Sequence, residues 1–411
     1  MPNQVNIPTI EDATFVNKMD ALKGTQDKIA AAVEILAANA RKEISNDWGS
    51  LEEFANTGLF AEAFGIGDQF VDTWKDTAAN QEYTYPYQLN HIGSVELKDG
   101  EVLSNRPFLQ AHFAHPFGVQ FSHNRAFLKC PEGLAVGTYY VTIESSWGSN
   151  VQAGDVVCFT TTQAVPAGGR VAGMYGAPDT AKSNWRIYTY SADGKTVLET
   201  ITPVFTASGT NLGTIKATQR NGNLNSMQET AYGWNRWKTS ALRQYLNSAA
   251  GVGNWWTAQD EWDIAPSELT TKAGFLTGCP EDFVEAIKEI KVVTYPNTVY
   301  DDPDGNTPDI TYDKVFIPSL EQIFVNPQKS GEGEYHEYWK RKSGSPTPLA
   351  QYGTYPSMIT YAVENHTSAQ YIRLRSAYRG YANNAWCVYS SGYVDSGSAS
   401  SSHRFSPLVV L

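Results

Sequence analysis

Apolar residues recur with a seven-residue rhythm near the N-terminus, between about Ile10 and Ile44. One heptad position is taken by Phe15, Leu22, Ile29 and Leu36, and the other by Met19, Gln26, Val33 and Ala40. Two such positions per heptad predict a helix able to form a coiled coil, although Gly24 lowers its helical stability. We therefore expect residues 1–50 to form a helical stem, which either self-associates or packs on its own domain.

After about residue 51 the pattern changes to aromatic and β-branched residues separated by turns. Residues 83–103 predict two strands joined at Asp99-Gly100, because an Asp-Gly pair supplies positive φ angles for a tight hairpin. Between about Phe121 and Phe205, alternating segments are punctuated by Gly, Pro and Asp-Gly turns. This spacing is typical of an immunoglobulin-like β-sandwich, which we place at residues 122–208.

Helical periodicity returns near residue 232. Leu242, Tyr245 and Leu246 lie on one helical face, and Ser240 is suited to the helix start. A second helix is expected at residues 281–291, a strand at 290–295 and a strand-like segment at 313–324. Together these elements predict a fold of the α+β class.

Between Tyr378 and His403, small or apolar residues alternate with polar and aromatic ones. The alternating positions are Tyr378, Tyr381, Asn383, Asn384, Cys387, Tyr389, Tyr393, Asp395, Ser396, Gly397, Ser398, Ser400, Ser401, Ser402 and His403. Each of these residues is Asn or is reached from an Asn codon by changing only its two leading adenines. That route never yields Lys, Glu, Gln, Met or Trp, and none of these occupies the positions. The segment therefore has the composition expected of diversified Asn codons.

The intervening residues are suited to a packed frame. Trp386 and Val388 alternate with Cys387 and Tyr389, so one face of a strand can pack while the other faces solvent. Tyr, Ser, Gly and Asn also dominate antibody binding loops. We predict a ligand-binding surface with Trp386, Val388 and Phe405 as structural residues. The alternative is a Ser-rich terminal loop without a particular role.

This segment resembles the variable regions of diversity-generating retroelement target proteins, in which adenine-specific mutagenesis rewrites Asn codons within a C-type lectin fold. The segments YGWNRWKTSALRQYLNS, KVFIPSLEQIF, RLRSAYRG and RFSPLVVL resemble successive landmarks of that lectin-like domain. The resemblance implies a C-type-lectin-like domain built from residues 51–121 and 209–411, with the variable region at 378–403 and the β-sandwich inserted. A sandwich that precedes the lectin-like domain in series is the alternative.

Target proteins of this kind look like receptor-binding tips of phage tail fibres or surface-displayed binders of bacteria. The resemblance implies a non-enzymatic, phage- or prophage-encoded adhesin whose ligand is a bacterial surface protein or glycan. Its expected partners are phage tail components and, through the stem, copies of itself, which would add avidity. The expected location is the virion, or the host cytoplasm before assembly, in preference to the bacterial surface.

Composition and charge disfavour several other classes of partner. Lys and Arg total 31 against 43 Asp and Glu, giving a formal charge of −12, which disfavours nucleic acid. No apolar stretch approaches the ~20 residues of a membrane span, and the first residues lack a secretory signal pattern. The four cysteines lie far apart without metal-binding spacing. We expect no membrane partner, disulfide framework, zinc site or cofactor.

Two groups of residues could nevertheless bind metal. His112, His115 and His123 lie close in sequence, but no carboxylate cluster accompanies them. The loop Asp301–Asp309 carries carboxylates suited to calcium but lacks the EF-hand spacing. We predict no metal site, with structural histidines and an exposed turn in their place.

Carbohydrate chemistry is the competing functional class. An aromatic group could stack sugars but is more suited to core packing; it consists of Trp234, Trp237, Trp255, Trp256 and Trp262. A carbohydrate-active enzyme would need paired carboxylates, for which composition offers Glu321, Glu332, Glu334 and Glu337. Such an enzyme, or a glycan-binding lectin of fixed specificity, is the alternative to a variable binding protein.

Overall fold

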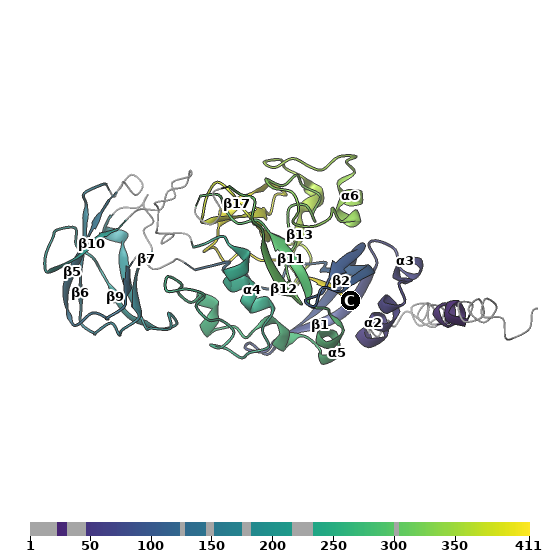
Figure 1. Cartoon of the computed structure of the whole chain (residues 1–411), viewed down its shortest axis with the longest axis horizontal. Coiled ribbons are helices and arrows are strands. Elements are labelled where there is room, and N and C mark those ends of the chain that lie inside the picture. The colour runs from purple at the N-terminus through teal and green to yellow at the C-terminus, as the bar shows by residue number, and fades with distance from the viewer. Residues whose placement is uncertain are drawn as a thin grey trace, which may run out of the picture.

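The computed structural model describes residues 23–30, 47–123, 128–144, 152–174, 182–215, 233–299 and 304–411. Strands predominate over helices within these ranges, and the fold is of the α+β class, as predicted. Figure 1 shows strands β5, β6, β7, β9 and β10 gathered at one end of the molecule, beside a larger body that contains the other labelled elements. Apart from the exposed helical residues 23–30, the described residues therefore form two packed units.

A four-stranded antiparallel sheet in the order β1-β2-β3-β18 organises the larger body. Its strands are β1 (Gln69–Asp76), β2 (Gln81–Glu96), β3 (Val102–Ala111) and β18 (Leu408–Val410). Val409 pairs with Leu109, so segments that are far apart in the chain share this sheet. One hydrophobic core buries side chains from both segments, including Trp48, Phe70 and Phe405.

The hairpin predicted at residues 83–103 is confirmed, because β2 and β3 pair on either side of Lys98-Asp99-Gly100. Of the Asp-Gly pair, only Gly100 has a positive φ, of 89°. The Asp99 side chain instead accepts a hydrogen bond of 3.0 Å from the backbone N–H of Glu101. Asp99 thus stabilises the turn through its carboxylate, and Gly100 supplies the left-handed conformation.

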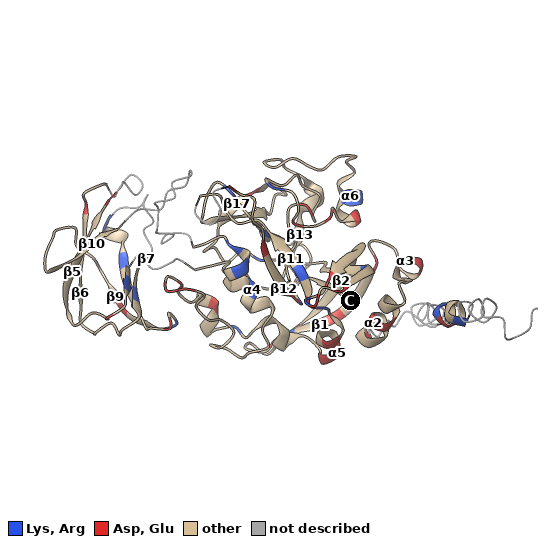
Figure 2. Ribbon diagram, in the orientation of Figure 1, with Lys and Arg blue, Asp and Glu red and all other residues tan. Residues whose placement is uncertain are grey.

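Short helices pack around this sheet and the segments that follow it. They are α2 (Trp48–Asn56), α3 (Phe60–Ala63), α4 (Ala241–Leu246), α5 (Glu281–Ala286) and α6 (Glu337–Ser343), with 3₁₀ turns at Lys182–Asn184, Trp237–Thr239, Ser267–Thr270, Phe275–Gly278 and Pro356–Met358. Figure 2 shows acidic residues on α5 and basic residues on α6. Acidic residues occupy the first turn of α5, and Lys340, Arg341 and Lys342 the last turn of α6, so both sets complement the helix dipole.

The second predicted helix is shorter than expected. The pattern predicted helix over residues 281–291, but α5 ends at Ala286 and β11 (Ile290–Thr294) follows at once. Strand β11 pairs with β12 (Asp309–Asp313), so the strand expected at 313–324 lies earlier in the chain. Pairing of Ile290 with Asp313 therefore outweighs the local helical pattern.

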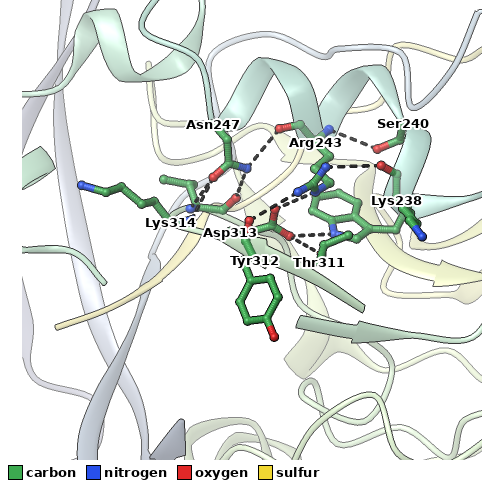
Figure 3. Close-up of polar contacts among 10 residues, drawn as sticks. Lys238, Ser240, Arg243, Asn247, Thr311, Tyr312, Asp313 and Lys314 are labelled. Atoms are coloured by element: carbon green, nitrogen blue, oxygen red, sulfur yellow. Dashed lines mark hydrogen bonds and ion pairs between the residues drawn. The ribbon is translucent and has the colours of Figure 1, made fainter. Parts of the chain in front are cut away.

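Hydrogen bonds and an ion pair connect α4 and its flanking residues to β12 (Figure 3). Arg243 Nε donates to Asp313 Oδ1 at 2.6 Å, and Trp237 Nε1 donates to Asp313 Oδ2 at 3.1 Å. Asn247 Oδ1 accepts the backbone N–H of Lys314 at 2.9 Å. Burial raises the pKa of Asp313 although Arg243 and two other hydrogen-bond donors oppose that shift. The position of α4 thus depends on a partly buried ion pair.

The N-cap of α4 gives a first testable prediction. Ser240 Oγ accepts the backbone N–H of Arg243 at 3.1 Å, as predicted for the helix start. Ser240→Ala should lower the free energy of unfolding by about 1 kcal/mol, measured by urea denaturation. In the control, Thr239→Ala, the hydroxyl forms only a 3.4 Å bond to Arg236 O, so the change should be below about 0.5 kcal/mol. Equal effects would contradict the capping role.

The described residues between 128 and 215 form a β-sandwich with its own core. One sheet has the order β4-β7-β8-β9 and the other β10-β5-β6. The strands are β4 (Leu128–Cys130), β5 (Gly137–Ile143), β6 (Val156–Thr161), β7 (Gly169–Met174), β8 (Arg186–Tyr190), β9 (Val197–Ile201) and β10 (Thr210–Ile215). A separate cluster buries residues of both sheets, including Val141, Phe159 and Ile187. The sandwich lies in the chain between β3 and β18, which pair in the other unit.

The C-terminal boundary of the sandwich differs from the prediction. Residue 208 was expected to end it, but β10 pairs in parallel with β5, so the sandwich extends at least to Ile215. It contacts the larger body through Arg170, whose Nε donates to Glu261 O at 2.9 Å, and through the 2.9 Å ion pair of Lys129 with Glu261.

Of the predicted stem, residues 23–30 and 47–50 are described. Residues 23–30 are helical and exposed, whereas residues 48–50 belong to α2, and Trp48 is buried in the core of the larger body, so the stem ends earlier than predicted. The heptad positions at Phe15, Met19, Leu22, Val33, Leu36 and Ala40 lie outside the described residues. Self-association through the stem therefore stays a prediction. Among the described residues, no helix combines the length and apolarity needed to cross a membrane.

Candidate ligand-binding surface

The predicted variable segment builds most of a three-stranded antiparallel sheet. Its strands are β15 (Ile372–Ala377), β16 (Asn384–Val388) and β17 (Val394–Ser398), with β16 in the centre. A short pair, β13 (Thr360–Tyr361) and β14 (Ala369–Gln370), precedes it in the chain. Figure 1 shows β17 at the upper edge of the larger body.

Strand β16 alternates as its sequence predicts. Trp386 and Val388 are buried in a cluster that includes Leu374. Cys387 lies between these two residues and pairs across the sheet with Arg373. Its side chain therefore belongs to the opposite face of the sheet.

Two predicted surface positions are buried, and the expectation that they face solvent is wrong. Asn383 is 1% and Cys387 0% exposed. The residues after β17 fold back over this face: a Cβ built on Gly397 would lie 3.0 Å from His403 Nε2 and 3.3 Å from Cys387 Sγ. Burial raises the pKa of the Cys387 thiol to about 12. Because the central strand β16 is covered on both faces, the Cys387 side chain has no route to solvent.

The other predicted positions are partly or fully exposed. They are Tyr378, Tyr381, Asn384, Tyr389, Tyr393, Asp395, Ser396, Gly397, Ser398, Ser400, Ser401, Ser402 and His403. We call the surface that they form, together with Tyr352 and Tyr371, the candidate surface.

One aromatic group on the candidate surface gathers around Tyr378. The rings of Tyr378 and Tyr381 lie 4.9 Å apart, and the hydroxyl of Tyr352 donates to that of Tyr378 at 3.2 Å. Tyr352 is 49% exposed. Sequence reasoning missed Tyr352, because it lies outside the alternating segment and no local pattern marks it.

A second aromatic group gathers around Tyr389. Its ring lies 5.7 Å from that of Tyr393 and 4.7 Å from that of Tyr371, which also stacks on His403 at 5.3 Å. Tyr371 is 40% exposed and was likewise missed. Burial raises the pKa of Tyr389 to about 12 and lowers that of His403 to about 3, so both are neutral at pH 7.

Hydrogen bonds among polar residues connect strands β16 and β17 between these groups. Asn384 Nδ2 donates to Ser396 Oγ at 3.2 Å, and the Tyr389 hydroxyl donates to Ser396 O at 3.1 Å. The candidate surface therefore combines aromatic rings with hydroxyl, amide and main-chain groups, a set suited to reversible binding of polar ligands.

Arg373 holds the main chain beneath the candidate surface. Its guanidinium is fully buried, and Nη1 donates to Ala385 O and Gly397 O, each at 2.9 Å. Nη2 donates to Ser398 O at 2.6 Å. Arg373 thus fixes β16 and β17 through carbonyl oxygens, which every residue type possesses.

Asn235 holds the main chain of the turn that leads into β16. This fully buried amide donates through Nδ2 to Tyr378 O at 3.1 Å, and to Tyr381 O and Asn384 O at 2.6 Å each. Its Oδ1 accepts from Asn297 Nδ2 at 3.0 Å, which fixes the orientation of the amide.

The segment after β17 is also held through its main chain. Gln120 Nε2 donates to Ser400 O at 2.7 Å, and the backbone N–H of Ser122 donates to Ala399 O at 3.1 Å. A Cβ on Gly118 would lie 1.8 Å from Ser402 O, so only glycine permits this approach. Residues from outside the segment thus hold its main chain both before and after the turn between β16 and β17.

The three neighbouring histidines have separate structural partners. His115 is buried between the hydroxyls of Tyr85, 3.0 Å from Nδ1, and Tyr245, 3.1 Å from Nε2. His112 Nδ1 contacts Gln88 Oε1 at 2.6 Å, and His123 Nδ1 contacts a glutamine side chain at 3.1 Å. In the part of the chain that the structure describes, no three His, Cys, Asp or Glu side chains group around a potential metal position.

The loop considered for calcium is only partly described, since residues 300–303 lie outside the described ranges. Within the remainder, Asp309 is buried and accepts from Arg236 Nε at 2.7 Å and Nη2 at 2.8 Å. This carboxylate is therefore committed to an ion pair.

The tryptophans considered for sugar stacking mostly belong to the core. Trp234, Trp237, Trp255 and Trp256 are buried, and Trp262 is partly exposed. The four cysteines are free thiols, as their spacing predicts.

The carboxylates considered for glycoside hydrolysis each have a partner. Glu321 accepts the backbone N–H of Gly331, and Glu332 accepts that of Tyr295 at 2.9 Å. Glu334 Oε2 lies at hydrogen-bond distance, 2.9 Å, from His91 Nε2, and Glu337 forms an ion pair with Arg341 at 3.1 Å.

Comparison with known proteins identifies one similarity. No curated protein and no solved structure matches the chain. Residues 213–410 match a family model that is described as a domain of unknown function, DUF6273. The match includes the sheet β15–β17 and the whole predicted variable segment. From the end of the sandwich to β18, this chain is therefore similar to DUF6273 domains.

Proposed function

We propose that this chain is a non-enzymatic binding protein of the diversity-generating retroelement type, which recognises its ligand through the candidate surface on a C-type-lectin-like scaffold. The single observation that carries the proposal is that buried side chains from outside the segment hold its main chain, while most of its own predicted binding residues are partly exposed. The proposed ligand is a bacterial surface protein or glycan. The proposed setting is a phage tail fibre, with tail components as partners and the virion or host cytoplasm as location.

The contacts of Arg373 and Asn235 favour this proposal because they tolerate sequence change. Six main-chain carbonyls accept hydrogen bonds from these two side chains at 2.6–3.1 Å. A contact made to a carbonyl oxygen survives replacement of the side chain on the same residue. A surface whose backbone is fixed in this way can change its side chains and remain folded.

The chemistry of the exposed side chains also favours binding. Tyrosine provides a large contact area with little loss of conformational entropy, and serine, glycine and asparagine adapt their hydrogen bonds to a partner. The two tyrosine groups, around Tyr378 and Tyr389, come before and after β16 in the chain, and a hydrogen bond between Asn384 and Ser396 connects β16 to β17. Tyrosine is enriched in protein binding surfaces, which also carry hydrogen-bonding groups.

Sequencing the source genome around the coding region tests the proposal directly. We expect a near-identical, non-coding copy of the terminal segment with adenines at the proposed variable codons, beside a gene for a reverse transcriptase. Isolates of one lineage should differ at those codons. A terminal segment that is single-copy and identical across isolates would refute diversification and leave a binding domain of fixed specificity.

Tolerance of substitution gives a prediction at the protein level. The double variant Tyr389→Asn/Tyr393→Asn should change the free energy of unfolding by less than about 1 kcal/mol, because both rings are partly exposed. The control Val394→Asn alters the buried residue that follows Tyr393 and should cost about 2 kcal/mol or more. Urea denaturation measures both. Equal losses would show that the exposed rings are structural.

A further inference from the structure

A carboxylate lies on the same face of the sheet as the aromatic group around Tyr389. Asp395 of β17 pairs across the sheet with Cys387, so it is a diagonal neighbour of Tyr389 on that face. Tyr393 lies two positions before Asp395, about 6.6 Å away along an extended chain, and its side chain points the same way. Burial is the main cause that raises the pKa of Tyr389, and the charges of nearby groups, Asp395 among them, add to it. A negative charge and tyrosine rings are therefore close together.

The tyrosine rings present accessible faces at different angles. Tyr371 and Tyr389 lie 4.7 Å apart and are inclined by 42°, and Tyr393 meets Tyr389 at 5.7 Å and 77°. Tyr371 is 40% exposed and the other two residues are partly exposed, so a ligand can reach all three. His403 stacks on Tyr371 and adds no positive charge, because burial lowers its pKa to about 3. Aromatic faces attract cations through the negative potential of their ring centres.

The carboxylate of Asp395 has no cationic partner among the described residues. Oδ1 accepts the backbone N–H of Ser396 at 2.7 Å, and Oδ2 forms neither a hydrogen bond nor an ion pair within the described part of the chain. Arg373 lies on the same face but is fully buried, and its guanidinium donates to main-chain carbonyls. Arg404, at the end of the segment, pairs with Glu364 at 2.6 Å. Asp395 is itself partly exposed, so its charge is available to a ligand.

The carboxylate and the rings together select one class of ligand. An anion is repelled by Asp395 and by the negative faces of the rings. A neutral ligand covers the carboxylate without supplying an opposite charge, and that desolvation is unfavourable. An ammonium group is attracted by the ring faces and donates charge-assisted hydrogen bonds to the carboxylate. The arrangement therefore favours an ammonium group over the other two classes.

We propose that the ligand recognised by this sequence presents an ammonium group to Asp395 and to the tyrosine rings beside it. The Asp395 site, as we call it, consists of Tyr371, Tyr389, Tyr393 and Asp395. This inference rests on the proposed function, because it names the ligand chemistry of the candidate surface. Three of the four residues occupy predicted variable positions, so the preference for a cation belongs to this sequence and changes with those codons. A lysine side chain of a protein and an amino sugar of a glycan both supply the required group.

Two pairs of small probes test the ligand class with the full chain and distinguish the two sources. The first pair is Nα-acetyl-lysine amide and its Nε-acetylated, neutral form, and the second is glucosamine and N-acetylglucosamine. Ligand-observed NMR should detect a charged probe with a dissociation constant on the order of 1 mM. Its acetylated partner should bind about fivefold or more weakly, because the cation–π and ionic contacts are lost.

The outcomes separate the sources from the class. A charge preference in the lysine pair alone indicates a protein ligand, and one in the sugar pair alone indicates a glycan; each supports an ammonium ligand. Acetylated probes that bind as tightly as the charged ones would overturn the proposal, as would absence of binding by all four. A diversified copy of the terminal segment in the genome would leave the proposed function intact in either case.

A substitution assigns the preference to Asp395. Asp395→Asn removes the charge but keeps the shape and an oxygen for the Ser396 N–H, so the melting temperature should change little. Affinity for the charged probe should fall about fivefold or more, to that of its acetylated partner. The control Glu334→Gln removes one negative charge from an exposed residue that contacts His91 instead, and should leave the preference unchanged. A charge preference that persists in Asp395→Asn would exclude this site.

Discussion

Lowering the pH from 7 to 5 should destabilise the folded protein by about 2 kcal/mol for each histidine that stays neutral in its interior. His115 and His336 meet this condition most fully, since both are almost completely buried. Burial is the main cause that holds the pKa of each well below its ordinary value, and nearby basic groups act in the same direction. The combined loss for these two residues is about 4 kcal/mol.

The sign follows from proton binding in the two states. In the unfolded chain a histidine takes up a proton below a pH of about 6.5, whereas the folded protein keeps these two neutral. Stability is therefore present above that pH and is lost progressively as the pH falls toward the folded pKa. His123, whose pKa is lowered to about 4, and His403, at about 3, add losses of the same sign.

Urea denaturation at pH 7, 6 and 5 measures how steeply the free energy of unfolding changes with pH. A variant shows how much of that slope comes from His115. His115→Gln keeps one donor and one acceptor for Tyr85 and Tyr245 but does not titrate, so its slope should be smaller by about 1.4 kcal/mol per pH unit below pH 6. The control Tyr85→Phe removes a hydrogen-bond partner and retains the titrating ring, so it should keep the full slope. A His115→Gln slope equal to that of the parent would exclude His115 as a contributor.

Replacing Arg373 by methionine should cost about 3–5 kcal/mol of folding free energy. Methionine retains much of the buried stem but leaves the carbonyls of Ala385, Gly397 and Ser398 without these donors. An unsatisfied buried acceptor costs about 1–3 kcal/mol. Ligand binding should be lost as well, because β16 and β17 would no longer hold a fixed geometry.

Arg404 provides the matched control. It lies close in sequence to the same segment and pairs with Glu364 at 2.6 Å, but both side chains are partly exposed. Arg404→Met should therefore cost only about 1 kcal/mol or less. Comparable losses in the two variants would mean that main-chain anchoring by Arg373 contributes little, and the proposed function would lose its principal support.

The sequence correctly predicted those elements that are determined by residues close together in the chain. The hairpin at Asp99-Gly100 and the cap at Ser240 depend on residues within a few positions of one another, and both are present. The limits of α5 and β12 could not be predicted, because pairing of Ile290 with Asp313 across the chain decides them.

The anchoring residues of the candidate surface were beyond sequence reasoning for the same reason. Asn235 reaches Tyr378, 143 positions away, and nothing in its neighbours indicates that contact. The alternation along β16 did predict which side chains share a face. It did not predict that residues after β17 fold back and cover one of those faces, which buries Cys387.

The two buried positions have a consequence for the size of a usable repertoire. If the codons of Asn383 and Cys387 are rewritten along with the others, most replacements would place a larger or charged group where neither solvent nor space is available. Protein copies with such replacements would misfold and could not bind a ligand. Diversification at these two codons would therefore alter how many copies fold, whereas diversification at the exposed positions would alter what the folded copies bind.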